Sequence, residues 1–199
     1  IAPEEIEAID LTEVELVHVT GIPPALSQSA REATFRLMDR AKEAGIFLTF
    51  DPNLRPALWE DGETMRTVIN RLAAKADMVL PGIGECEVLA GTKSREEAAD
   101  FYQKLGVKTV IVKDGAKGAY VQTEKEQYDV AGYPVEHVVD TVGAGDGFAV
   151  GILSGILEGQ DLKTSVKRGN AIGAIQVMNI GDNEGLPTQE ELKAFQENK

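Results

Sequence analysis

The sequence predicts an α/β fold with a mainly parallel sheet and helices on both faces. Short apolar runs rich in β-branched residues alternate with longer amphipathic stretches along most of the chain, which is the pattern of strand–helix units. Capping residues stand before several of the amphipathic stretches, and glycines follow them. The chain has 199 residues, enough for one domain with a sizeable core. No internal repeat, low-complexity tract or linker interrupts it, so residues 1–199 are predicted to form one domain.

The individual elements follow from these local signals. Apolar or β-branched runs predict strands at Leu16–Thr20, Ile46–Phe50, Met78–Leu80, Thr109–Val112, Ala119–Gln122, Gln127–Val130 and Val135–Val139. Capping residues predict helices that begin at Ser29, Asp61, Ser94 and Thr188. Apolar stretches predict two further helices, Phe148–Leu157 and Leu162–Val177. The pair Ala119–Gln122 and Gln127–Val130 is expected to form a hairpin or an extension of the sheet.

Composition excludes several classes of function. A net charge of −13 argues against nucleic acid or an anionic membrane as a partner. The single cysteine, Cys86, allows no intramolecular disulfide and is typical of a reducing compartment, so we expect a cytoplasmic protein. The apolar run Phe148–Leu157 is shorter than the roughly 20 residues of a membrane span. The sequence leaves open whether identical copies assemble.

The segment Asp140–Gly147 carries the strongest functional signal. Its glycines free the backbone to curl, so consecutive N–H groups can point into one concavity at the start of a helix, where an anion is favoured. Asp146 stands in the same turn, and an acid beside an anion site suits a base that deprotonates a nucleophile attacking a phosphoryl group. A dinucleotide-binding fingerprint would lie in the first strand–helix–strand unit instead. A purely structural glycine turn also competes, and Gly151, Gly155 and Gly159 are predicted to permit close helix packing.

The segment Asp140–Gly151 resembles the C-terminal signature of the ribokinase-like carbohydrate kinases of the phosphofructokinase-B type. The resemblance continues through Asp51–Arg55 and Lys113–Gly118 and reaches Thr188, so it covers most of the chain. It implies an ATP-dependent sugar kinase in which Asp146 is the catalytic base. It also implies that the backbone amides of Gly143, Ala144 and Gly145 form the anion hole.

The same resemblance implies roles for residues elsewhere in the chain. It places Asn53 and Arg55 near the transferred phosphate, Asn170 near adenine, Asp182 on the substrate and Glu85 in the organisation of Mg²⁺. It assigns the nucleotide loop to Lys113, Asp114, Gly115 and Gly118. From the residues alone, the loop reads as an ordinary turn, Arg55 as a surface arginine paired to Asp51 or Glu60, and Glu85 or Glu87 as a helix N-terminal acid. Gly82 stands where the family's metal motif has asparagine, which weakens the choice of Glu85 over Glu87.

Because the carboxyl ends of parallel strands meet at one edge of a sheet, the candidate side chains are expected to lie at such ends. The Asp51–Arg55 motif with Leu58 and Trp59 is shared by relatives that phosphorylate fructose or 2-keto-3-deoxygluconate. The tail Gly181–Thr188 resembles the second group, so the expected substrate is that sugar acid, with fructose as the alternative. A relative that binds sugar or nucleotide without turnover is the third hypothesis.

The first residues bear on how much of the fold is present. The chain opens on Ile1 in an acidic segment typical of the middle of a domain. The resembled family carries a further stretch before this point, with a glycine-rich signature and a small β lid. We therefore expect the chain to be the C-terminal two-thirds of a longer protein that lacks the N-terminal part of the fold.

Overall fold

The computed structural model of the protein describes residues 1–198. Six strands form one sheet in the order β1-β2-β3-β4-β5-β6, and β1 to β4 pair in parallel with their neighbours. The strands are β1 (Leu16–Thr20), β2 (Phe47–Asp51), β3 (Met78–Val79), β4 (Thr109–Lys113), β5 (Gly118–Thr123) and β6 (Gln127–Ala131). The predicted α/β class with a mainly parallel sheet is confirmed. The hairpin is also confirmed, since the Thr123 N–H donates to the Glu126 carbonyl oxygen at 2.8 Å across the β5–β6 turn.

The chain divides into two compact units. The first comprises residues 1–112 and 121–127, and the second comprises residues 113–120 and 128 onward. Each unit is therefore built from two separate segments of the chain. The connection between β4 and β5 belongs to the second unit, whereas the turn between β5 and β6 belongs to the first.

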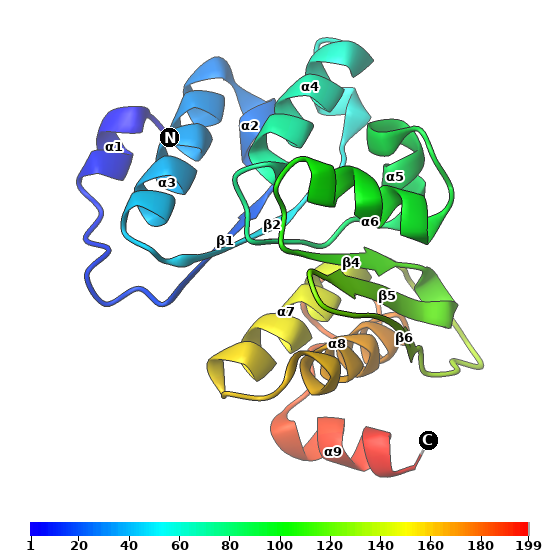
Figure 1. The fold of residues 1–199 in the computed structure, drawn as a ribbon. Helices are drawn as coiled ribbons and strands as arrows, with labels where there is room; N and C mark the ends of the chain where they lie inside the picture. The colour runs from blue at the N-terminus through cyan, green and yellow to red at the C-terminus, as the bar shows by residue number, and fades with distance from the viewer. Residues whose placement is uncertain (199) are drawn as a thin grey trace. The chain divides into compact units, whose positions relative to one another are not determined.

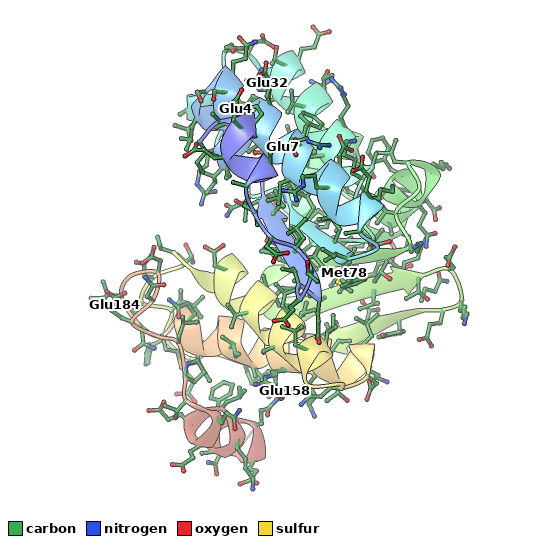
Figure 2. All side chains as sticks on the ribbon, turned by 90° about the vertical axis from the view of Figure 1, so that its left-hand side faces the viewer. Glu4, Glu7, Glu32, Met78, Glu158 and Glu184 are labelled. Carbon is green, nitrogen blue, oxygen red and sulfur yellow. The ribbon has the colours of Figure 1, made fainter. Side chains whose placement is uncertain are left out.

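The first unit contains β1 to β3, nearly all of β4 and six helices. The helices are α1 (Pro3–Glu7), α2 (Pro23–Leu26), α3 (Gln28–Glu43), α4 (Gly62–Ala73), α5 (Ile83–Ala90) and α6 (Arg95–Lys104), with a 3₁₀ turn at Pro56–Leu58. Strand residues such as Leu48 and Phe50 are buried, as are Met38 of α3 and Ile69 of α4. Figure 2 marks Met78 within β3, where its side chain is also buried.

Helix starts in the first unit follow the predicted caps with one exception. Asp61 caps α4, because its side chain accepts hydrogen bonds from the N–H groups of Glu63 and Thr64, and Ser94 caps α6 in the same way through Glu97. The predicted start of α3 at Ser29 is wrong. Ser27 is the cap, with its hydroxyl oxygen accepting from the Ala30 N–H at 3.1 Å.

The second unit contains the start of β5 and nearly all of β6, a 3₁₀ turn at Gly115–Lys117 and three helices. These are α7 (Ala144–Leu157), α8 (Leu162–Gln176) and α9 (Gln189–Glu197), the last capped by Thr188 as predicted. Figure 1 shows α7 and α8 lying side by side. Among residues 1–198, no helix is long and apolar enough to cross a membrane.

Small residues make the close approach of α7 and α8 possible. A Cβ on Gly151 would lie 2.5 Å from the Gly169 Cα, and one on Gly155 would lie 2.6 Å from the Ser165 Oγ. The predicted packing role of these two glycines is confirmed. The same prediction for Gly159 is wrong, because a Cβ there would meet nothing within 4 Å; its φ of +76° instead suits the turn that follows α7.

The predicted strand Val135–Val139 is absent, and its β-branched residues lie in irregular backbone. The N–H groups of Val139 and Asp140 both donate to the Val177 carbonyl oxygen, just after α8, at 2.8 and 3.3 Å. A β-branched run forms a strand only where a neighbouring strand offers a ladder of partners. Here the end of α8 supplies a single carbonyl instead.

Candidate active site

The centre of the candidate site is the first turn of α7. Helix α7 begins at Ala144, four residues before the predicted start at Phe148. Its N-cap is Gly143, whose φ of +74° is a left-handed conformation that glycine adopts without a Cβ clash. The residues proposed for the anion hole therefore occupy the N-cap and first turn, where helix N–H groups lack carbonyl partners within the helix. The Ala144 N–H makes a long hydrogen bond to the Thr141 carbonyl oxygen, just before the helix, at 3.4 Å. An anion is favoured at such a position.

Asp146 lies in this first turn, and its side chain is exposed. An acid at the third helical position is stabilised by the helix dipole, so its presence has a structural explanation as well as the catalytic one. Its exposure beside the helix N-terminus leaves it accessible to a substrate hydroxyl. The geometry is compatible with the predicted base, whose role stays a prediction.

Lys113, at the end of β4, places a cation over the same turn. Its Nζ lies 3.6 Å from the position that a Cβ on Gly145 would take. The positive charge and the helix N-terminus together favour a bound anion more than either does alone. The structure thus brings Lys113 to the predicted anion hole, although the two segments are about thirty residues apart in the sequence.

In the rest of the predicted nucleotide loop, Asp114 and Gly118 have structural roles, whereas Gly115 does not. The Asp114 carboxylate pairs with Lys117 at 3.2 Å. Gly118 has a φ of +96°, and a Cβ there would overlap the backbone of Val130 and Ala131 in β6. Gly115, with a φ of +54°, is exposed and has open space around it. Of the two glycines, Gly115 is therefore the one that leaves room for a ligand to approach.

Asp182 lies beside the same helix start. A Cβ on Gly143 would fall 2.6 Å from the Asp182 carbonyl oxygen and 2.7 Å from its Cα, so the two backbones are in close contact. The Asp182 side chain is exposed. The predicted base and the predicted substrate-binding acid thus project from adjoining segments of one unit.

Two residues absent from the predicted site hold this arrangement. The Asp140 carboxylate accepts hydrogen bonds from the Val142 N–H at 3.0 Å and the Gly181 N–H at 3.3 Å. These backbone donors hold the pKa of Asp140 below its ordinary value, because they stabilise the charged form. Gln176, the last residue of α8, donates from Nε2 to the Gly181 carbonyl oxygen at 3.0 Å. A glutamine at the end of the apolar run Ala171–Ile175 is the sequence signal that could have drawn attention to it.

In the first unit, the ends of β2 and β3 are joined through Glu85. Its Oε1 accepts from the Leu54 N–H at 2.8 Å, and its Oε2 accepts from the Gly82 N–H at 2.7 Å. Asn53 adopts a φ of +38° and donates its N–H to Oδ1 of the buried Asp51 at 3.1 Å. The Asp51–Arg55 segment and Glu85 therefore meet beyond the carboxyl ends of β2 and β3 within this unit.

Arg55 is exposed, and its guanidinium donates to the carbonyl oxygen of the adjacent Leu54 at 3.0 Å. Glu60, one of its predicted structural partners, pairs instead with Arg31 at 3.6 Å. An exposed guanidinium is compatible with binding a phosphate. Its proximity to a transferred phosphate stays a prediction.

Glu85, the residue predicted to organise Mg²⁺, has backbone hydrogen-bond partners of its own. Within residues 1–198, no three His, Cys, Asp or Glu side chains gather as a metal-binding group. Both carboxylate oxygens of Glu85 accept backbone N–H groups, so this residue braces two loops, and its part in organising Mg²⁺ stays a prediction. Glu87 points elsewhere and pairs with Lys93 at 3.1 Å.

Asn170 is buried in α8. Its Nδ2 donates to the carbonyl oxygens of Val130 and Ala131 at 3.0 and 3.1 Å. These bonds tie α8 to the end of β6, and this structural role by itself accounts for an asparagine at this position. The predicted contact with adenine stays untested, and any such contact would have to be made from this buried position.

Comparison with known proteins gives a consistent result. The sequence pattern of the pfkB family of carbohydrate kinases matches residues 2–189. The chain is 52% identical over 179 residues to 2-dehydro-3-deoxygluconokinase of Bacillus subtilis (strain 168), covering 90% of this chain and 55% of that protein.

Two crystal structures show the same likeness in three dimensions. The first is a PfkB protein from Polaromonas sp. JS666, with a TM-score of 0.83 and 45% identity over 95% of this chain and 61% of that one. The second is a fructokinase from Vibrio cholerae O395 bound to fructose, ADP and calcium ion, with a TM-score of 0.90 and 33% identity over 98% of this chain and 64% of that one. The chain thus spans little more than half the length of the proteins it matches.

Proposed function

This chain belongs to the pfkB family of carbohydrate kinases, and we propose that it is the part of an ATP-dependent sugar kinase that carries the catalytic base. The proposed substrate is 2-keto-3-deoxygluconate. The observation that carries the proposal is the exposed Asp146 in the first turn of α7, beside an anion-favouring helix N-terminus and the Lys113 ammonium. The 52% identity to a 2-dehydro-3-deoxygluconokinase supports the choice of sugar.

In the proposed reaction, the Asp146 carboxylate takes the proton from a sugar hydroxyl. The hydroxyl oxygen forms a bond to the γ-phosphorus of ATP while the bond from that phosphorus to the bridging oxygen breaks, and ADP leaves with the electron pair. General-base assistance of this kind contributes about 10²–10⁴-fold in rate. The proton resides on Asp146 until solvent removes it.

The N-terminus of α7 supplies the second part of the mechanism. N–H groups of Ala144 and Gly145, with the Lys113 ammonium, would face the negative charge that spreads over the transferred phosphoryl oxygens. A divalent cation would arrive with the nucleotide phosphates, which supply most ligands for such ions. The roles of Asn53 and Arg55 at the phosphate, of Gly115 at the nucleotide and of Asp182 at the sugar are part of the same proposal.

Fructose is the second candidate substrate. A fructokinase that binds fructose and ADP is 33% identical to this chain and has a TM-score of 0.90 with it. A coupled assay of the intact protein, with ATP and each sugar in turn, separates the candidates by the kcat/KM for ADP release. We expect the value for 2-keto-3-deoxygluconate to exceed that for fructose by at least about tenfold, since loss of one well-placed hydrogen-bonding partner changes affinity by this order.

The opposite ranking would make fructose the substrate. Binding of both ligands without sugar-dependent ADP release would instead favour a non-catalytic relative. A cytoplasmic location remains a prediction, and the assembly of identical copies stays open.

A further inference from the structure

Gln176 has a polar side chain at a buried position, where an apolar side chain would make the fold more stable. It is fully buried at the end of α8, one helical turn after the buried Ile172. Its Nε2 is bonded to the Gly181 carbonyl oxygen, but its Oε1 has no hydrogen-bond partner among the described residues. A buried acceptor without a partner costs free energy. A residue that carries such a cost is expected to have a functional role, such as holding another segment in place.

Glycines surround this side chain on two sides. A Cβ on Gly143 would lie 2.9 Å from Nε2 of Gln176, and one on Gly185 would lie 2.7 Å from Oε1 and 3.0 Å from the Gln176 Cα. The glutamine therefore fills the space between the start of α7 and the turn at residues 181–185. It holds Gly181 by a hydrogen bond and Gly185 by direct contact.

The turn also makes hydrogen bonds within itself, from the Asn183 N–H to Glu184 Oε2 at 3.2 Å and from the Leu186 N–H to the Asn183 carbonyl oxygen at 3.1 Å, but these bonds do not tie it to the rest of the unit. The side chains of Asp182, Asn183 and Glu184 are all exposed, so none anchors the turn by burial. Figure 2 marks Glu184 on this loop between α8 and α9. The backbone contacts to Gln176, Asp140 and Gly143 consequently set where the Asp182 carboxylate stands relative to Asp146.

We propose that Gln176 is a positioning residue for sugar binding, because it holds the 181–185 turn against the N-terminus of α7 and thereby places Asp182. This inference rests on the proposed function, which assigns Asp182 to the sugar. Gln176 itself does not touch the substrate. Its effect should fall on the affinity for the sugar and leave the affinity for ATP and the chemical step unchanged.

The test substitutes Gln176→Met, which keeps the length of the side chain and removes both polar atoms. In the intact protein, the KM for the sugar should rise about three- to tenfold, the range expected when one hydrogen bond is lost. The kcat and the KM for ATP should stay within about twofold of the parent values. Gln122→Met is the matched control, because Gln122 is a buried glutamine in the other unit whose Nε2 bonds Asp100 and Gln103.

A second variant approaches the same contact from the opposite side. Gly185→Ala would place a methyl group against Gln176 and should reproduce the rise in sugar KM. Amide hydrogen exchange gives a readout that needs no turnover: residues 178–186 should exchange faster in Gln176→Met and at the parent rate in Gln122→Met.

Two results would overturn the proposal: an unchanged sugar KM in both variants of an active enzyme, or unchanged exchange in residues 178–186. A parent protein with no sugar-dependent turnover would overturn the proposed function instead, and exchange would then decide whether Gln176 fixes the turn.

Discussion

The Glu85 carboxylate accepts a hydrogen bond from the Leu54 N–H at 2.8 Å and thereby joins the loop after β2 to the helix after β3. Its other oxygen closes the first turn of α5 through the Gly82 N–H. Gly82 has no side chain with which to cap the helix, so Glu85 performs that role from within it. The acid is thus fixed by two backbone donors, and this arrangement distinguishes it from the nearby Glu87.

The first prediction follows from this difference. Glu85→Gln replaces one accepting oxygen with an N–H₂ group facing a backbone donor, so the free energy of unfolding should fall by about 1–3 kcal/mol. Glu87→Gln, which breaks only the exposed pair with Lys93, should change it by less than about 0.5 kcal/mol. Urea unfolding of both variants measures this.

The same two variants test the predicted link to Mg²⁺. The concentration of Mg²⁺ for half-maximal rate should rise more in Glu85→Gln than in Glu87→Gln. An equal or reversed effect would show that Glu85 has no special connection to the metal.

The second prediction concerns pH. The pKa of Asp140 is lowered in the folded state by the N–H groups of Val142 and Gly181, so its charged form stabilises the fold. This contribution is fully present above the unfolded-state pKa of about 3.9 and is lost as the pH falls through the lower folded-state value. Asp140→Asn should therefore destabilise the protein at pH 7 and progressively less below about pH 4. A difference in unfolding free energy that stays constant from pH 7 to pH 3 would contradict this.

The third prediction compares the N-cap glycine of α7, Gly143, with a glycine inside the helix, Gly151. Gly143→Ala forces a side chain into a left-handed conformation and against Asp182, whereas Gly151→Ala forces a methyl group against Gly169. Each should lower the free energy of unfolding by about 1–3 kcal/mol through overpacking or strain. Only Gly143→Ala should also raise the KM for the sugar, because only it displaces the 181–185 turn. Thermal unfolding and steady-state kinetics on the same preparations distinguish the two effects.

Local sequence signals correctly predicted the features that depend only on neighbouring residues, such as helix caps. Asp61 and Thr188 cap their helices as expected, because a cap needs only its own side chain and the N–H groups two or three residues later. The same logic misplaced the start of α3, since Ser27 and Ser29 are equally plausible caps when judged from sequence. The short helix α2, with two prolines in four residues, gave no helical periodicity to detect.

Features that depend on distant partners could not be predicted in the same way. Val135–Val139 has the composition of a strand but no neighbouring strand to pair with, and composition does not reveal that. Asp140 matters because Gly181, 41 residues later in the sequence, returns to it, and Gln176 matters because the 181–185 turn folds back onto the end of α8. The motif around Asp146 was recognisable because its glycines and its acid lie within one turn.

The most direct test of the whole account is the kcat of Asp146→Asn in the intact protein, with Asp129→Asn, an exposed acid on β6, as the matched control. If Asp146 is the base, its substitution should lower kcat by about 10²–10⁴-fold and leave both the ATP dissociation constant and the free energy of unfolding close to those of the parent. The control should retain the parent kcat. A kcat for Asp146→Asn within a few-fold of the parent value would contradict the account, because the proton would then have another acceptor.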